Sequence, residues 1–223
     1  MNVEQLIVKS LQELKQIACE KDTSVKQSSK LIFPKYCVGI HSKHEDTQQR
    51  ISEQEIRFLF ARELENQENK HPFFYSIEIP TKESYKFSLS KKDNKSKNKP
   101  KDYFPRILDV DAGGRSASID LTLYEKEDGK GFCRKHLIEF KQGNVDTCKK
   151  DFLKLLYDMD ELENYYINVL YREDWSNGEP LSSLIGKYQS AINKLITDDN
   201  NKDRKKNSKL KIILFKTVLR AVI

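Results

Sequence analysis

Residues 118–141 read SIDLTLYEKEDGKGFCRKHLIEFK, and this stretch decides the fold that we expect around it. Two runs of alternating apolar and polar residues flank a glycine-containing turn, a pattern that predicts a β-hairpin. If the turn is the dipeptide Gly129–Lys130, the ladder places Asp120 directly opposite Glu139. Opposed side chains share one face with Cβ atoms about 5 Å apart, where two like charges are destabilising. Lys141 lies two residues beyond Glu139 and projects to the same side.

A divalent cation held between the two carboxylates would explain why they face each other. Mg²⁺ takes oxygen ligands, commonly one or two carboxylates completed by water and phosphate oxygens. Asp120 and Glu139 supply that minimum, and Phe140 adds a backbone carbonyl. A bound metal lowers the pKa of its water and neutralises phosphate charge. Lys141 would orient the attacking water, help to deprotonate it, or stabilise the charge of the transition state. The pattern predicts metal-assisted phosphodiester hydrolysis with Mg²⁺ or Mn²⁺.

The competing interpretation of these residues is a surface ion-pair patch on the sheet. Asp120 lies between Ile119 and Leu121, and Glu139 lies between two apolar residues in the same way. Each strand therefore has a buried face opposite its acid, and an acid–acid pair without a cation is unfavourable. We favour the catalytic interpretation for this reason.

Composition sets broad limits on the class of protein. The chain has 223 residues, 37% hydrophobic and 33% charged, with a formal net charge of +6. It is long enough for one domain with a sizeable core, and its mild excess of positive charge is compatible with a polyanionic partner. Four cysteines without paired spacing, and no apparent signal segment, predict free thiols in the cytoplasm. No apolar run reaches the length of a membrane span, so we expect no membrane partner.

The order of the expected elements predicts a mixed β-sheet flanked by helices, of the α/β or α+β class. Apolar residues at helical spacing predict helices over 2–20, 52–66, 145–160 and 181–197. The expected strands are 73–80, closed by Pro80, with 84–90 returning as a hairpin partner, then 106–115, the central hairpin, 165–173 and 210–219. We expect residues 1–50 to form a helix and a connecting segment that pack on a domain formed by 51–223.

The residues Asp120 in SIDLTL and Glu139–Phe140–Lys141 in LIEFK resemble the motif of the PD-(D/E)XK nuclease superfamily, the restriction-endonuclease-like fold. The resemblance spans about residues 50–172 and extends to the order helix, strand meander, helix, strand. Ile119 stands where the family motif has proline. The resemblance implies that Asp120 and Glu139 are metal ligands and that Lys141 is the catalytic lysine. It also implies restriction, repair or phage defence as the setting.

Many members of that family add an acidic residue from the first core helix. Glu55 and Glu63 are the candidates here, and we favour Glu55 because it is nearer the helix start. The alternative for Glu55 is a capping box with Ser52. Gln142, directly after the lysine, matches a polar residue of some branches and would contact phosphate or water.

Other polar clusters carry weaker indications. Asp109 and Asp111 alternate toward the site, and we interpret them as turn and edge acids. Cys37, His41 and His44 have loose zinc-like spacing without an evident fourth ligand, which argues against a zinc site.

Two lysine-rich segments, 90–102 and 201–211, lack the apolar residues of a core and read as loops. In a nuclease they would contact phosphates and make binding salt-dependent. The lysines of the first segment are the nucleic-acid-binding candidates: Lys91, Lys92, Lys95, Lys97 and Lys99.

The sequence therefore predicts a Mg²⁺- or Mn²⁺-dependent nuclease acting on DNA, double-stranded in our interpretation. Two alternatives stay open. One is a non-catalytic nucleic-acid-binding or protein-interaction domain on the same fold, and the other is a nuclease directed at RNA. A homodimer that cuts both strands and a monomer that nicks one are both compatible with the sequence.

Overall fold

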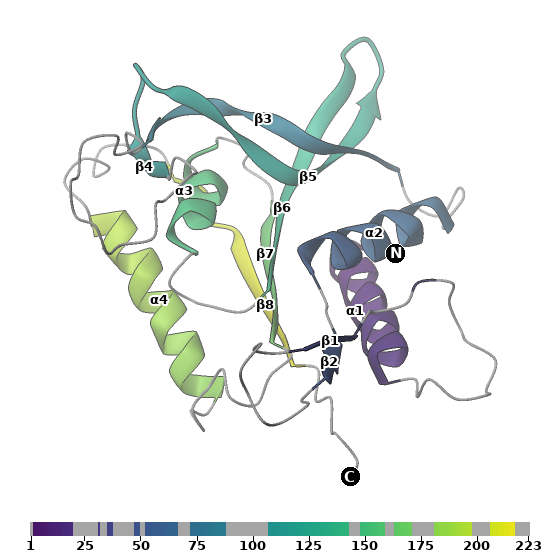
Figure 1. Cartoon of the computed structure of the whole chain (residues 1–223). Helices are drawn as coiled ribbons and strands as arrows, with labels where there is room; N and C mark the ends of the chain where they lie inside the picture. The colour runs from purple at the N-terminus through teal and green to yellow at the C-terminus, as the bar shows by residue number, and fades with distance from the viewer. Residues whose placement is uncertain are drawn as a thin grey trace.

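A six-stranded mixed sheet forms the centre of the protein, in the strand order β4-β3-β5-β6-β7-β8 (Figure 1). The computed structural model describes residues 2–19, 31, 35–37, 47–49, 52–66, 72–87, 107–142, 148–158, 163–170, 181–197 and 206–216. The first four strands of that order pair antiparallel, whereas β6, β7 and β8 pair parallel. The strand bounds are β3 Phe73–Phe87, β4 Ile107–Val110, β5 Arg115–Glu127, β6 Gly131–Gln142, β7 Asn164–Leu170 and β8 Leu210–Lys216.

Four helices cover the two faces of the sheet, which confirms the predicted α/β class (Figure 1). They are α1 Val3–Cys19, α2 Glu53–Asn66, α3 Lys149–Tyr157 and α4 Leu181–Thr197. The helices α1 and α2 pack with one face of the sheet in a single apolar cluster. The helices α3 and α4 pack with the other face in a second cluster. Each helix has its apolar residues at the spacing that the sequence showed.

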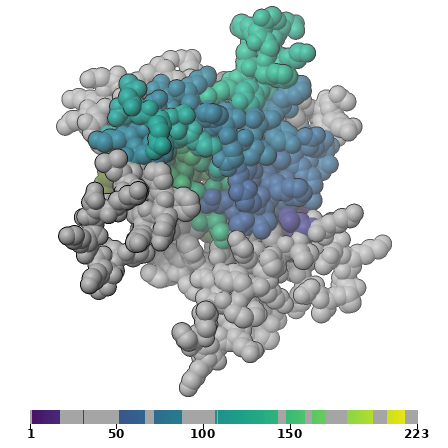
Figure 2. Space-filling model, turned by 45° about the horizontal axis from the view of Figure 1, so that its top comes forward, coloured from purple at the N-terminus to yellow at the C-terminus, as the bar shows by residue number. Residues whose placement is uncertain are grey.

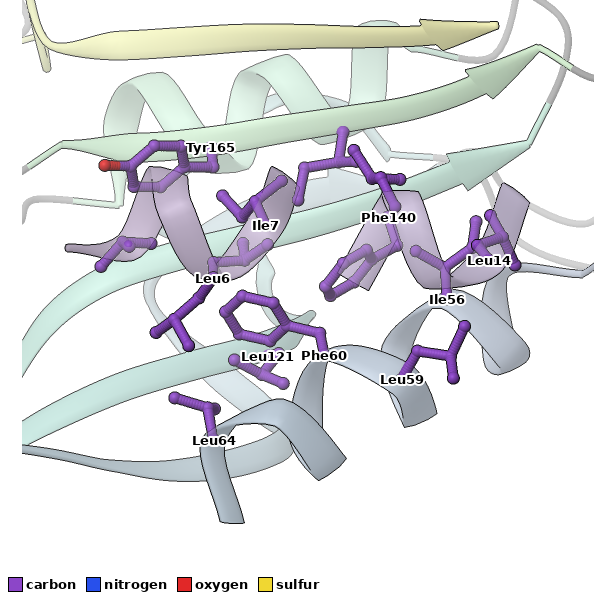
Figure 3. Close-up of a cluster of buried hydrophobic side chains, with 14 of the residues drawn as sticks. Leu6, Ile7, Leu14, Ile56, Leu59, Phe60, Leu64, Leu121, Phe140 and Tyr165 are labelled. Carbon is purple, nitrogen blue, oxygen red and sulfur yellow. The ribbon is translucent and has the colours of Figure 1, made fainter. Parts of the chain in front are cut away.

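The first cluster joins the N-terminal helix to the rest of the fold. Figure 3 shows Leu6 and Ile7 of α1 directed toward Phe60 of α2 and the sheet residues Leu121 and Phe140. The ring centroids of Phe60 and Phe140 lie 5.8 Å apart. All five side chains are at most 1% exposed. The segment containing α1 is therefore part of the core that supports β5 and β6.

The hairpin of β5 and β6 has the predicted register near Asp120, although the predicted turn is wrong. Glu127 pairs with Gly131, so the turn contains three residues rather than the dipeptide Gly129–Lys130. Relative to the predicted register, this longer turn shifts the ladder by one residue. A bulge at Lys135 shifts it back, so that Leu121 pairs with Ile138 as the shorter turn would require. One residue further, this register places Asp120 opposite Glu139.

The end of the hairpin projects from the body of the molecule, and Figure 2 shows it in green. Phe74 of β3 packs against Phe132 of β6 there, with ring centroids 4.9 Å apart in an edge-to-face arrangement. Both rings are more than half exposed. Since β5 lies between β3 and β6, this contact joins the two outer strands of the three and adds aromatic packing at the end of the hairpin.

The strand β3 corrects a second prediction. The sequence suggested two strands, 73–80 and 84–90, that form a hairpin, but β3 is one continuous strand of 15 residues. Its ladder with β5 has an irregularity between Pro80 and Ser84. The Thr81 hydroxyl accepts a 2.8 Å hydrogen bond from the Ala117 N–H and donates to the Glu83 carbonyl at 2.7 Å. The irregularity therefore accommodates the proline, which has no N–H to donate to a regular ladder.

The turn between β4 and β5 requires a glycine. A Cβ atom on Gly114 would lie 2.2 Å from the backbone oxygen of Tyr85. This distance is too short for any residue with a side chain, so the position requires glycine. Asp111 closes this turn by accepting a 2.9 Å hydrogen bond from the Gly113 N–H. This confirms the prediction that Asp111 is a turn residue.

Several sequence predictions fall on residues outside the described part of the chain. These include Lys91, Lys92, Lys95, Lys97 and Lys99, the histidines His41 and His44, and residues 201–205 of the segment 201–211. The short strands β1 Lys35–Cys37 and β2 Thr47–Gln49 form a separate antiparallel pair. Among the described helices, none combines the length and the apolar character needed to cross a bilayer.

Candidate active site

The predicted site lies where β5 and β6 cease to pair. The last regular ladder pair is Leu121 with Ile138. Beyond it, Asp120 Oδ2 accepts a 2.8 Å hydrogen bond from the backbone N–H of Phe140. The N–H and C=O of one residue in a strand point toward the same neighbouring strand. The Phe140 carbonyl is therefore directed toward Asp120, across the point where β5 and β6 separate. This direction is compatible with the predicted role of the carbonyl as a metal ligand.

Burial dominates the electrostatics of the two acids. Glu139 is 1% exposed, and burial raises its pKa well above the ordinary value, as do the nearby carboxylates of Asp120 and Asp151. Burial also raises the pKa of Asp120, while the Phe140 N–H, Lys154 and Lys141 oppose that rise. A raised carboxyl pKa in a site with other charges is typical of functional positions.

Lys141 lies between acids from two different helices. Its Nζ is 3.0 Å from Glu53 Oε1, at the first residue of α2, and 3.8 Å from Asp151 Oδ2 of α3. Burial lowers the pKa of Lys141, but Asp151 and Glu53 raise it above the ordinary lysine value. Lys141 therefore keeps its proton, which favours orienting water or stabilising negative charge over accepting a proton.

The structure adds a second lysine that the sequence interpretation missed. Lys154 of α3 is 5% exposed. Its Nζ lies 2.6 Å from Glu139 Oε1 and 3.2 Å from Asp151 Oδ1, and it donates to the Ser118 carbonyl at 2.9 Å. Burial lowers its pKa, but Glu139 and Asp151 outweigh burial and raise it. A signal existed in the sequence: Asp151 and Lys154 interrupt the apolar run DFLKLLY at i,i+3 spacing, which indicates a buried polar pair.

The helix glutamate near the site is Glu53 rather than the favoured Glu55. Glu55 accepts a 2.6 Å hydrogen bond from the Ser52 N–H and contacts the Ser52 hydroxyl, so it forms the capping box. Glu63, the other candidate, pairs with Lys9 of α1 at 2.6 Å and belongs to the contact between the two helices. The backbone nitrogen of Gln142 lies 3.4 Å from Glu53 Oε1, and the contact of its side chain with phosphate or water stays a prediction.

An arginine of α2 fixes the other side of Asp120. Arg57 is 5% exposed, pairs with Glu78 of β3, and donates to the backbone oxygen of Asp120 at 3.3 Å. Glu78 has a φ of 54°, a conformation unusual for a residue with a side chain. The Ser118 hydroxyl donates to it at 2.7 Å. Burial raises the pKa of Glu78, but the hydrogen bonds from Ser118 and Arg57 lower it overall. The ionised pair therefore holds the strained backbone beside Asp120.

The donor set fits a hard divalent cation. The carboxylates of Asp120 and Glu139 and the Phe140 carbonyl are oxygen ligands of the kind that Mg²⁺ and Mn²⁺ take. The four carboxylates and two lysines of the cluster leave a formal charge of two negative, which one divalent ion would neutralise. Within the ranges that the structure describes, no three histidine, cysteine or acidic side chains already form a metal-binding group. Water and substrate oxygens would complete the shell.

Comparisons with known proteins add no relative to this picture. No protein-family model, no curated protein and no solved structure matches the chain.

Proposed function

We propose that this protein is a metal-dependent nuclease that hydrolyses DNA phosphodiester bonds on a restriction-endonuclease-like core. The observation that carries the proposal is the placement of Lys141 Nζ beside the Asp120–Glu139 pair, 3.0 Å from Glu53 and 3.8 Å from Asp151. The helix α2, the β5–β6 hairpin and the helix α3 thus all contribute charged side chains to the site, at the end of the hairpin away from its turn. A structural ion-pair patch would not require four carboxylates around two lysines.

Each residue of the cluster has a distinct role in the proposed reaction. Asp120, Glu139 and the Phe140 carbonyl would hold Mg²⁺ or Mn²⁺, which supplies charge neutralisation and acidification of a bound water. Lys141, which keeps its proton, orients the attacking water and stabilises the negative charge that develops on the phosphoryl oxygens. Glu53 holds the lysine through both of its carboxylate oxygens, at 3.0 and 3.2 Å. The structure thus favours two of the three roles that the sequence left open for Lys141.

A non-catalytic nucleic-acid-binding domain is the second candidate. One observation favours it: Lys154 pairs with Glu139, so a cation of the protein itself can balance that carboxylate. Such a domain would bind nucleic acid without a requirement for divalent ions.

A cleavage assay separates the candidates. The purified protein is incubated with supercoiled, linear and branched DNA, and with RNA, in Mg²⁺ or Mn²⁺ and with EDTA. We expect metal-dependent cleavage of DNA that is lost in Lys141→Ala and retained in Lys150→Ala, which changes an exposed lysine of α3. Wild-type cleavage by the Lys141→Ala protein would contradict the assigned role. DNA binding without cleavage in either metal would favour the second candidate, and selective cleavage of RNA would redefine the substrate.

A further inference from the structure

The buried ammonium of Lys154 lies beside one oxygen of a carboxylate that the proposed metal site needs. Lys154 Nζ is 2.6 Å from Glu139 Oε1, and both side chains are almost completely buried. The contact is ionic rather than a well-aligned hydrogen bond, because Glu139 Oε1 has no hydrogen-bond donor among the described residues. The Glu139 carboxylate therefore has a cation of the protein itself beside it.

A metal and this ammonium would compete for the same carboxylate. Mg²⁺ binds oxygen at about 2.1 Å, so an ion on Glu139 Oε1 would lie within about 5 Å of Lys154 Nζ in its present position. Two positive charges at that distance repel strongly when water is largely excluded. The ammonium must move, or its repulsion must weaken metal binding.

Asp151 offers the ammonium a second position. Asp151 Oδ1 lies 3.2 Å from Lys154 Nζ on the same helix. Asp151 is fully buried, and neither of its carboxylate oxygens accepts a hydrogen bond from the described part of the chain. The Ser118 carbonyl, 2.9 Å from Nζ, is a third partner. Lys154 can thus leave Glu139 while it keeps an anionic partner and a hydrogen-bond acceptor.

We propose that Lys154 is an internal cation that takes the place of the divalent ion at Glu139 in the metal-free protein, and that it moves onto Asp151 when the metal binds. This inference rests on the proposed function, because it assumes that Asp120 and Glu139 are the ligands. It makes the metal affinity of the site a property of α3 as well as of the hairpin.

Direct measurement of metal binding tests the inference without any substrate. Mn²⁺ is titrated calorimetrically into the full-length wild type, Lys154→Met and Lys150→Met, the last changing an exposed lysine of the same helix. We expect Lys154→Met to bind Mn²⁺ at least tenfold more tightly than wild type, and Lys150→Met to match wild type. Unchanged or weaker binding by Lys154→Met would overturn the inference, because it would show that Lys154 supports Glu139 rather than competing with the metal.

A second variant covers the case in which Lys154→Met does not fold. Asp151→Asn removes the alternative anionic partner and leaves Lys154 on Glu139. We expect it to bind Mn²⁺ about tenfold more weakly than wild type, and wild-type affinity in this variant would overturn the inference. Asp120→Asn and Glu139→Gln report on the proposed function separately. If wild type binds no Mn²⁺, or if these two variants bind it as well as wild type, the ligand assignment fails and the inference fails with it.

Discussion

The carboxylate of Asp120 accepts a 2.8 Å hydrogen bond from the backbone N–H of Phe140, at the point where β5 and β6 separate. One oxygen of Asp120 thus replaces a ladder acceptor and leaves the other oxygen for a ligand. The same bond fixes the carboxylate relative to Glu139, the next residue toward the hairpin turn. A single side chain therefore both ends the strand pairing and defines the candidate site.

Two substitutions at Asp120 separate these roles. Asp120→Asn keeps an oxygen acceptor for the Phe140 N–H, whereas Asp120→Ala leaves that donor unpaired. We expect Asp120→Ala to lower the free energy of unfolding by about 1–2 kcal/mol more than Asp120→Asn. Both should lose Mn²⁺ binding and cleavage. Urea denaturation and calorimetry measure the two effects, and equal stability of the variants would show that the hydrogen bond contributes little.

The two glutamates at the start of α2 should have different phenotypes. Glu53 holds Lys141, so Glu53→Gln should reduce cleavage at least tenfold with little change in stability. Glu55 forms the capping box, so Glu55→Ala, which removes the acceptor, should retain cleavage and lower the free energy of unfolding by about 1 kcal/mol. Cleavage kinetics and thermal unfolding of both proteins check this assignment. The opposite result would restore the role that the sequence favoured for Glu55.

The buried pair of Arg134 and Asp158 should be a large contributor to stability. Asp158 is fully buried, pairs with Arg134, and accepts a 2.8 Å hydrogen bond from the Glu83 N–H. Asp158→Ala leaves the arginine without this partner and should cost about 3–5 kcal/mol. Glu127→Ala removes exposed pairs at the hairpin end and serves as the control, with little expected change. Denaturant titration at neutral pH compares them, and a cost for Asp158→Ala as small as the control would contradict the burial argument.

His136 should make stability depend on pH. Burial lowers its pKa below the ordinary value of 6.5, although the Glu163 carbonyl, 2.7 Å from Nδ1, opposes that shift. A histidine with a lowered folded-state pKa favours the folded state above the unfolded pKa, and this contribution is lost as the pH falls through 6.5 toward the folded-state value. We expect the free energy of unfolding to fall between pH 7.5 and 5.5, and to fall less in His136→Phe. An equal fall in both proteins would assign the pH dependence to other groups.

Gly114 and Gly113 form a matched pair for testing the β4–β5 turn. A Cβ on Gly114 would meet the Tyr85 backbone oxygen at 2.2 Å, whereas one on Gly113 would meet only Asp111 Oδ1 at 3.6 Å. Gly114→Ala should therefore destabilise the protein by about 1–3 kcal/mol, the usual cost of inserting a methyl group into occupied space. Gly113→Ala should have a much smaller effect. Thermal unfolding measures both, and similar melting temperatures would contradict the close approach.

Patterns local in sequence predicted much of the fold. The four helices and the register around Asp120 follow from periodicity within single segments, where the spacing of apolar residues is informative. The prediction of two strands at 73–90 was wrong because it treated Pro80 as a strand end. The structure places the proline in a strand irregularity that Thr81 hydrogen bonds across. No property of Pro80 alone distinguishes these two outcomes.

The candidate site was predictable only in part. Asp120, Glu139 and Lys141 share one hairpin, so strand register alone brings them together. Glu53 and Lys154 reach the cluster through the packing of α2 and α3 on the sheet, and the sequence spacing does not encode that packing. Glu55 was preferred to Glu63 because it lies nearer the start of the helix. Glu53 lies nearer still, but it was not among the candidates. The roles of all these residues remain predictions for the experiments above.

The hairpin contains two irregularities whose effects on the residue numbering of the ladder cancel. Relative to a two-residue turn, the three-residue turn displaces the ladder by one residue, and the extra residue Lys135 restores it before the strands reach the site. Because Lys135 is the extra residue between Arg134 and His136, deleting it would remove the bulge and leave His136 opposite Leu123, so Glu139 and Lys141 would keep their face of the sheet. Deleting one turn residue would likewise leave Glu127 opposite Gly131. The projecting end can therefore vary in length during evolution or design without a change of register at the candidate site.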